Sequence, residues 1–259
     1  MKVLIIGATG YLGPYVATAL APHHQLRLTD VNPPATDPGH EFLRVDISSL
    51  EQVMKAAEGM DAIVNCSVVR AGTQLAFDVN MVGCWNMMTA AVKHGIRRVI
   101  NTGPHLSFTA ATYEGIDYEI SADVPPHSGT NLYGLTKSLG QEICKVFTEH
   151  HDIYVLDYLF YNFREPPAAR PSSINSATPA APKYVRQGEN PVPFVVSGTD
   201  AAEAIRLGLE IDAAKLPSRC EVLLILTDMP HGKFRNDKAK RILGFVPKDD
   251  LAPLWRKAP

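Results

Sequence analysis

The chain has 259 residues, of which 46% are hydrophobic, 20% charged and 8% aromatic. These proportions are those of ordinary soluble globular proteins and exclude a disordered or fibrous chain. Lys and Arg number 25 against 27 Asp and Glu, a net charge of −2, and this balance argues against the basic surface that a nucleic-acid partner requires.

Short apolar runs rich in β-branched residues alternate with helix-like stretches along the chain. Strands are predicted at 3–6, 26–29, 62–65, 98–102, 153–160 and 221–227. Helices are predicted at 11–20, 50–57, 74–94, 132–150, 200–211 and 236–243. This alternation predicts right-handed βαβ units and an α/β fold, a Rossmann-type doubly wound parallel sheet with helices on both faces.

The regular alternation stops after the strand at 153–160. Residues 165–193 are rich in Pro, Ala and Ser and are predicted to be mostly irregular chain. A loop of this length in a compact protein is usually either functional or disordered. Its place after a central strand favours a lid or a wall over a binding site, and a surface excursion is the alternative.

A glycine-rich turn, Gly7 to Gly13, joins the first strand to the first helix. Gly7 permits the tight turn, Gly10 lets the backbone approach a pyrophosphate at the helix N-terminus, and Gly13 lets the helix pack closely on the strand. We therefore predict a dinucleotide site and keep a purely structural turn as the alternative. The residues predicted to form it are Gly7, Thr9, Gly10, Tyr11, Leu12 and Gly13.

Acidic residues follow the next two strand-like segments. Asp30 can accept hydrogen bonds from both adenosine ribose hydroxyls and would repel a 2′-phosphate, and no Lys or Arg follows it before Arg44. This favours NAD over NADP, with a turn residue as the alternative. Asp46 and Ile47 are candidates to bind and wall the adenine, although Asp before Ser-Ser is also a common start of a helix.

The strongest chemical signal is Tyr133 with Lys137, four residues apart on a predicted helix. That spacing puts both side chains on one helix face, where the ammonium can lower the pKa of the phenol and also reach a cofactor ribose. A phenolate prepared in this way can take a proton from an alcohol as hydride leaves for nicotinamide.

The four cysteines, Cys66, Cys84, Cys144 and Cys220, are far apart in the sequence and have no partner at zinc-ligand spacing. Neither a disulfide framework nor a metal site is expected, and a reducing cytoplasm fits best. The apolar run at the N-terminus is soon broken by glycines, so we interpret it as a buried strand rather than a signal peptide. No apolar stretch approaches the roughly 18 residues of a membrane helix.

Taken together, these segments resemble the extended short-chain dehydrogenase/reductase superfamily, its NAD-dependent epimerase/dehydratase group. The resemblance covers nearly the whole chain and is carried by the glycine turn, Asp30, Asp46-Ile47, Asn80 to Gly83, Tyr133 to Lys137, Asn162 and residues 194–204. It implies a Rossmann domain at 1–160 and a small substrate-binding region at 161–259 interleaved with the sheet. It also implies NAD as cofactor, Tyr133 as acid/base with Lys137 as its partner, and a structural role for Asn80.

The resemblance further implies a cofactor contact where the strand at 62–65 ends, at Asn65, Cys66 and Ser67. The helices at 74–94 and 132–150 resemble those of the family's dimeric four-helix bundle, which implies a homodimer. Burial within one subunit explains their apolar residues equally well.

One position departs from the family. A Ser or Thr that hydrogen-bonds the substrate oxygen usually stands where this chain has Gly103. Thr102 is adjacent and is the candidate to serve instead, while His105 and Ser107 are alternatives in the following loop.

Within the family, the chain looks most like the uronate dehydrogenase and sugar dehydrogenase branch. The similar features are His105, residues 123–126, the turn at 165–166 with Arg170 after it, and the ending at 243–250. In that branch an arginine after the turn pairs with the sugar acid's carboxylate, and Arg170 matches it by position. Arg70 and Asn162 are further candidates for substrate binding.

The resulting hypothesis is an NAD-dependent oxidoreductase that oxidises a hydroxyl of a small sugar or sugar acid. One alternative is an NAD-dependent epimerase or dehydratase, in which the cofactor is reduced and reoxidised within one turnover. Another is a non-catalytic NAD-binding protein. The intact Tyr133 and Lys137 favour an enzyme, whereas Gly103 counts for the non-catalytic alternative.

Overall fold

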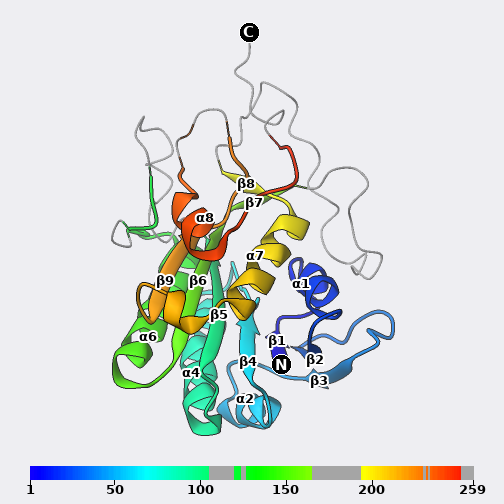
Figure 1. Ribbon diagram of the computed structural model, residues 1–259. Helices are drawn as coiled ribbons and strands as arrows, with labels where there is room; N and C mark the ends of the chain where they lie inside the picture. Colours follow the sequence, from blue (N-terminus) through cyan, green and yellow to red (C-terminus); the bar gives the residue numbers. More distant parts are fainter. Residues whose placement is uncertain (105–119, 124–126, 165–193, 230–231, 233, 252–259) are drawn as a thin grey trace.

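The computed structural model describes residues 1–104, 120–123, 127–164, 194–229, 232 and 234–251 (Figure 1). These residues form one central parallel sheet covered by helices, with a small second sheet above one end of it. The predicted lid at 165–193 lies outside the described residues, as do His105, Ser107 and Arg170.

The central sheet has seven parallel strands in the order β3-β2-β1-β4-β5-β6-β9. The strands are β1 (Lys2–Ile6), β2 (Gln25–Asp30), β3 (Glu41–Arg44), β4 (Ala62–Asn65), β5 (Arg98–Pro104), β6 (Tyr154–Phe160) and β9 (Cys220–Leu224). The direction of winding reverses between β1 and β4, and such a switch point leaves a crevice at the carboxyl ends of the two strands. The predicted doubly wound sheet is confirmed.

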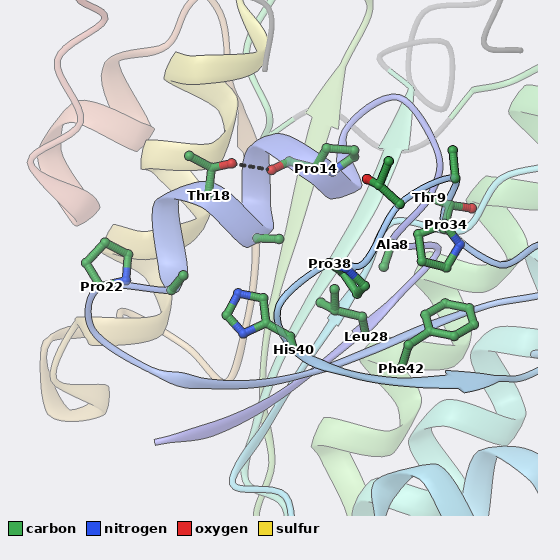
Figure 2. Close-up of a pocket in the computed structure, with 14 residues that line it drawn as sticks. Ala8, Thr9, Pro14, Thr18, Pro22, Leu28, Pro34, Pro38, His40 and Phe42 are labelled. Atoms are coloured by element: carbon green, nitrogen blue, oxygen red, sulfur yellow. Dashed lines mark hydrogen bonds between the residues drawn. The ribbon is translucent and has the colours of Figure 1, made fainter. Parts of the chain in front are cut away.

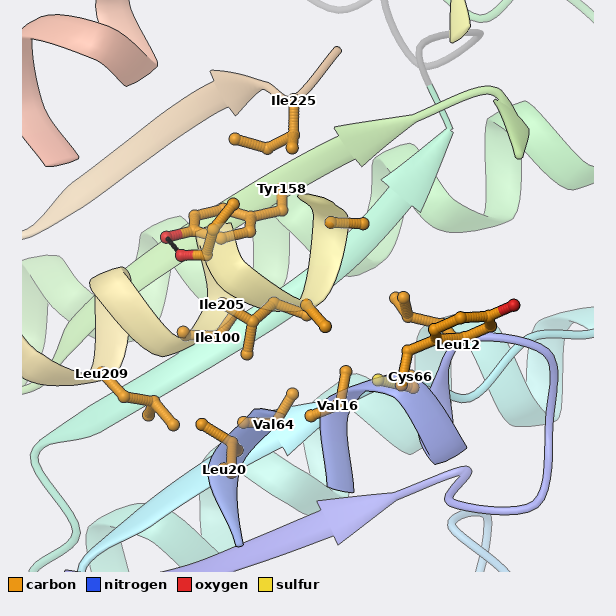
Figure 3. Close-up of a cluster of buried hydrophobic side chains, with 14 of the residues drawn as sticks. Leu12, Val16, Leu20, Val64, Cys66, Ile100, Tyr158, Ile205, Leu209 and Ile225 are labelled. Carbon is orange, nitrogen blue, oxygen red and sulfur yellow. Dashed lines mark hydrogen bonds between the residues drawn. The ribbon is translucent and has the colours of Figure 1, made fainter. Parts of the chain in front are cut away.

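Helices cover both faces of this sheet because successive strand residues point to opposite sides. Val3 and Ile5 belong to the same apolar cluster as residues of α1 (Gly13–Leu20), α7 (Gly198–Glu210) and α8 (Asp237–Leu243). Leu4 and Ile6 belong to the cluster formed with α2 (Leu50–Ala57), α4 (Gly83–His94) and α6 (Leu132–His150). Figure 3 shows the first cluster, where Val16 and Leu20 of α1 lie opposite Ile205 and Leu209 of α7.

The helix predicted at 74–94 is not one regular helix. It consists of α3 (Thr73–Phe77), a π-helical turn η1 (Asp78–Val82) and α4. A spacing of apolar residues three and four apart does not distinguish an α-helical turn from a π turn, which holds one residue more. The first helix begins at Gly13 and not at residue 11, because Pro14 stands at its start and residues 10–12 belong to the turn.

The C-terminal part of the described chain joins the same sheet through β9 and packs on it through α7 and α8. The last strand ends at Leu224 and not at 227 as predicted. The Ile225 amide still donates to the Leu159 carbonyl of β6, but the Thr227 amide donates to the carbonyl of Val195 instead. Val195 lies in β8 (Val195–Val196), which pairs with β7 (Asn162–Phe163) in the second sheet. A short 3₁₀ helix, η3 (Ala213–Lys215), precedes β9.

No helix among the described residues is both long enough and apolar enough to cross a lipid bilayer.

Candidate functional site

The glycine turn after β1 is packed tightly at two of its glycines and open at the third. A Cβ on Gly7, whose φ is +79°, would lie 2.6 Å from the amide nitrogen of Ser67, and one on Gly13 would lie 2.3 Å from the carbonyl oxygen of Ala8. On Gly10 the nearest atom is the turn's own Gly7 carbonyl, at 3.3 Å. Gly10 is also exposed, so its backbone is accessible to a ligand, as a pyrophosphate cradle requires.

Asp30 holds this turn from the end of β2. Its Oδ2 accepts a hydrogen bond from the Thr9 amide at 3.1 Å, and its Oδ1 accepts one from the Asn32 amide at 3.2 Å. The structural role that the sequence left as an alternative is therefore present. A carboxylate has lone pairs beyond these two contacts, so the same group can still accept from a ribose hydroxyl.

A cleft of about 760 Å³ opens at the switch point between β1 and β4. Eight of the residues predicted to bind cofactor line it, namely Gly7, Thr9, Gly10, Asp30, Asp46, Ile47, Cys66 and Ser67. Asp46 makes the local contacts of a helix entry, because its Oδ1 accepts from the Ser48 amide and hydroxyl. Residues predicted to bind the cofactor therefore line one cleft. Two of them, Asp30 and Asp46, also make local hydrogen bonds that hold its walls.

The other predicted cofactor residues lie behind the walls of this cleft. Tyr11 packs on Phe163 and Tyr15, with ring centroids 5.0 and 5.8 Å apart. Leu12 is part of the apolar core, and Asn65 is fully buried. Gly13 packs against Ala8, as described above.

Lys137 lies buried beneath the carboxyl ends of β4 and β5. Its Nζ donates to the carbonyl of Ser67 at 2.7 Å and to that of Thr102 at 2.9 Å. Burial lowers the pKa of this ammonium. The Thr102 hydroxyl is also occupied, because it donates to the carbonyl of Asn65 at 2.8 Å.

Tyr133 lies half-buried in the first turn of α6, which Asn131 caps by accepting from the Gly134 amide at 2.8 Å. Arg70 stands over its ring, with the guanidinium carbon 5.3 Å from the ring centroid. Burial raises the pKa of Tyr133, whereas the charge of Arg70 and its hydrogen bond to the phenol act in the lowering direction. No pattern in the sequence indicates this contact, since Arg70 follows β4 and Tyr133 belongs to α6.

Asn80, in the π turn, connects the loop that carries Arg70 to α6. Its Oδ1 accepts from the Val69 amide at 3.0 Å, and its Nδ2 donates to the Val69 carbonyl at 2.7 Å and to the Thr136 hydroxyl at 3.0 Å. Asn80 thereby fixes the backbone next to Arg70 against the helix that carries Tyr133.

At Gly103 the space for a side chain is filled from α6. A Cβ there would lie 2.6 Å from Gln141 Nε2 and 3.2 Å from Leu159 Cδ2. Gln141 stands on the same helix face as Tyr133 and Lys137, two turns after Tyr133 and one turn after Lys137. Of the remaining candidates for substrate binding, Asn162 lies half-buried in β7, and His105 and Arg170 fall outside the described residues.

A second hollow, of about 330 Å³, lies between α1 and residues 34–42 (Figure 2). Pro14, Pro22, Pro34 and Pro38 line it together with small apolar side chains, and His40 is its one titratable residue. Because it assembles no pair of acid–base groups, we assign the chemistry to the cleft at the switch point.

Comparison with known proteins agrees with this geometry. A family model described as the NAD-dependent epimerase/dehydratase family matches residues 3–201. A uronate dehydrogenase of Pseudomonas putida is 30% identical over 159 residues, a match that covers 59% of this chain and 57% of that relative. An NAD-dependent glucose-6-phosphate dehydrogenase of Haloferax volcanii is 23% identical over 96% of this chain and 94% of that protein.

Solved structures share the fold. The crystal structure of a uronate dehydrogenase from Agrobacterium tumefaciens superposes with a TM-score of 0.75, at 21% identity, over 96% of this chain and 84% of that one. A partial-consensus L-threonine 3-dehydrogenase gives a TM-score of 0.78 at 18% identity, over 98% and 96% of the two chains.

Proposed function

The chain belongs to the NAD-dependent epimerase/dehydratase family, and from this premise we propose that it is an NAD-dependent oxidoreductase that oxidises a hydroxyl of a small sugar or sugar acid. One observation carries the proposal. The Tyr133–Lys137 pair stands at the carboxyl edge of the sheet, where Lys137 binds the same Ser67 that lines the cleft with the glycine turn.

The residues of the cleft suit the proposed cofactor. Gly10 leaves its backbone open to a pyrophosphate, Asp30 offers lone pairs to the adenosine ribose, and Asp46 and Ile47 lie where an adenine would be bound. When bound, NAD would supply the acceptor for a hydride.

In the proposed reaction Tyr133 acts as the base. Its phenolate takes the hydroxyl proton of the substrate, and Arg70 stabilises that phenolate by its charge and its hydrogen bond. Lys137 holds the ends of β4 and β5 together through the carbonyls of Ser67 and Thr102. It thereby fixes the strand ends beside which cofactor and substrate would bind.

A sugar acid is the substrate class that these residues favour. An exposed guanidinium beside the base is suited to a carboxylate, which it can bind through two parallel hydrogen bonds. The names of the P. putida and A. tumefaciens relatives point to the same class. Asn162, His105 and Arg170 remain predicted substrate contacts.

A second candidate is an epimerase or dehydratase, because the family model that matches the chain describes these reactions; Gly103 bears on either reaction. A hydroxyl at this position would help to orient the substrate oxygen, but the space there is taken by Gln141. Measuring the products distinguishes the two reactions, because a dehydrogenase releases NADH and an epimerase or dehydratase does not. Loss of the hydroxyl also keeps open the non-catalytic NAD-binding protein.

We also propose a homodimer in the cytoplasm. Trp85 of α4 and Val146 of α6 are 53% and 41% exposed, and the Trp85 ring meets Phe147 edge-on at 5.2 Å between centroids. Large apolar side chains exposed on two packed helices favour an interface between two copies of the chain. A molar mass in solution of twice the 28.3 kDa of one chain would support the homodimer. The four cysteines form no disulfide, in keeping with a reducing compartment.

The test is to mix the purified protein with NAD and a panel of uronic acids, aldoses and polyols, and to follow nicotinamide reduction. We expect NADH to accumulate with one class of sugar acid and Tyr133→Phe to abolish the reaction while NAD still binds. Substrate consumed without net NADH would favour the epimerase or dehydratase. NAD binding with no turnover of any substrate would favour the non-catalytic protein.

A further inference from the structure

Three polar residues stand side by side in the buried interior of the sheet. Asn65 of β4 pairs in register with Asn101 of β5, which pairs in register with Asp157 of β6. Their exposed fractions are 0%, 0% and 1%. Strands covered on both faces are usually apolar, and burying a carboxyl group is costly. This row therefore requires an explanation beyond packing.

The row is joined by hydrogen bonds that all run in one direction. Asn101 Nδ2 donates to Asp157 Oδ1 at 2.7 Å, and Asn65 Nδ2 donates to Asn101 Oδ1 at 2.9 Å. Asn65 Oδ1 then accepts from the Ser67 hydroxyl at 2.6 Å and from the Ser67 amide at 3.0 Å. The row thus connects Asp157 to a residue that lines the cleft.

The direction follows from the chemistry of the last member. Asp157 Oδ1 is the accepting oxygen, both in the carboxylate and as the carbonyl oxygen of the neutral acid, so the amide of Asn101 turns its NH₂ toward Asp157 and its oxygen toward Asn65. Asn65 must then turn its own oxygen toward Ser67. In a buried network each such orientation is enforced, because an amide facing the wrong way leaves two donors or two acceptors in contact.

We propose that Asp157 is a positioning residue, which acts through Asn101 and Asn65 to hold Ser67 in the cleft with its carbonyl directed at Lys137. The inference rests on the proposed function, since it assigns Asp157 to the same site. Asp157 itself touches neither Tyr133 nor the glycine turn in any contact of the described residues.

Asp157 is also bordered by a cavity of about 430 Å³ beside α6 and β9. The cavity gives room for a slightly larger side chain at 157, so Asp157→Val removes the acceptor without overpacking the strand.

The experiment compares Asp157→Val with Asp157→Asn, which keeps an acceptor oxygen. Tyr158→Phe is the matched control, because it removes a buried hydrogen bond from the next residue of β6, on the other face of the sheet (Figure 3). Hydrogen exchange of the Ser67 amide is measured by NMR in each variant without cofactor. The NAD dissociation constant and kcat/KM are measured in parallel.

In Asp157→Val we expect the Ser67 amide to exchange about tenfold faster. We also expect weaker NAD binding and a kcat/KM lower by about tenfold or more. Asp157→Asn and Tyr158→Phe should both keep the Ser67 protection of the unchanged protein. If Asp157→Val does not fold, Asp157→Ala replaces it, with the same measurements and the same expected results.

The proposal is overturned if the Ser67 amide exchanges at the same rate in Asp157→Val as in Tyr158→Phe. It is also overturned if Asp157→Asn loses as much Ser67 protection and kcat/KM as Asp157→Val. If the unchanged protein does not bind NAD, the proposed function fails, and the exchange at Ser67 still decides whether Asp157 positions it.

Discussion

At the scale of single residues, the contacts of the two cations near Tyr133 depend on the fold more than on the sequence. Helical spacing predicts that Lys137 shares a face with Tyr133, and it does lie on α6 as expected. Its ammonium, however, is bound to the carbonyls of Ser67, just after β4, and of Thr102 in β5, and Arg70 from the loop after β4 stands against the phenol. Spacing within a helix fixes which side chains share a face, but not what the neighbouring strands offer them.

Arg70→Met should reduce the fraction of Tyr133 that is ionised at neutral pH. Arg70 lowers the pKa of Tyr133 against the raising effect of burial, so its removal moves that pKa further upward. Because the base must be ionised, the acidic limb of the kcat/KM profile moves to higher pH, and activity at pH 7 falls by about tenfold or more.

The matched control for this prediction is Arg97→Met, which removes a similar contact between a guanidinium and the ring of Tyr154, at 5.9 Å, away from the cleft. A pH profile of Arg70→Met that coincides with that of Arg97→Met would contradict the role given to Arg70.

At the scale of elements, the sheet could be predicted because its signals are local. Each buried strand is a short apolar run, each helix follows it, and parallel pairing then follows from the right-handed crossover. The glycine turn, Asp30 and the end of β4 were predicted for the cleft by the same logic. The π turn, the filling of Gly103 by Gln141 and the Arg70–Tyr133 contact were not, because each depends on packing between segments distant in the sequence.

The glycine turn separates binding from folding, and two substitutions test this. Gly10→Ala places a methyl group on the exposed side of the turn. We therefore expect the free energy of unfolding to change by less than about 1 kcal/mol, while NAD affinity is lost. Gly13→Ala would put its methyl group 2.3 Å from the Ala8 carbonyl and should destabilise the protein by more than about 2 kcal/mol.

Urea unfolding and NAD titration of both variants provide the measurements. Equal loss of stability in the two variants would show that Gly10 is structural as well.

At the scale of the whole molecule, the buried Asp157 makes stability depend on pH. Burial raises the pKa of its carboxyl from 3.8 to about 7. Between these values the folded protein holds a proton that the unfolded chain releases, so the free energy of unfolding falls as pH rises from about 4 to about 7 and then levels off.

Asp157→Asn removes this dependence and, by the hydrogen bonds described above, keeps the row intact. We expect it to be more stable than the unchanged protein at pH 8 by a few kcal/mol, on the order given by the pKa difference, and to lose this advantage toward pH 4. Urea unfolding of both proteins at pH 5 and pH 8 measures the difference. A stability difference that is the same at both pH values would contradict the prediction.

The π turn at Asp78–Val82 also limits how the gene can vary in length. Deleting one residue there would restore a regular α-helix and rotate everything before it by about 100° relative to α4. Asn80 would then no longer face Val69, and the loop that carries Arg70 would lose the connection to α6 that Asn80 provides. Loops in a protein usually tolerate insertions and deletions, but we expect the turn at Asp78–Val82 to tolerate neither, because the orientation of Asn80 depends on its number of residues.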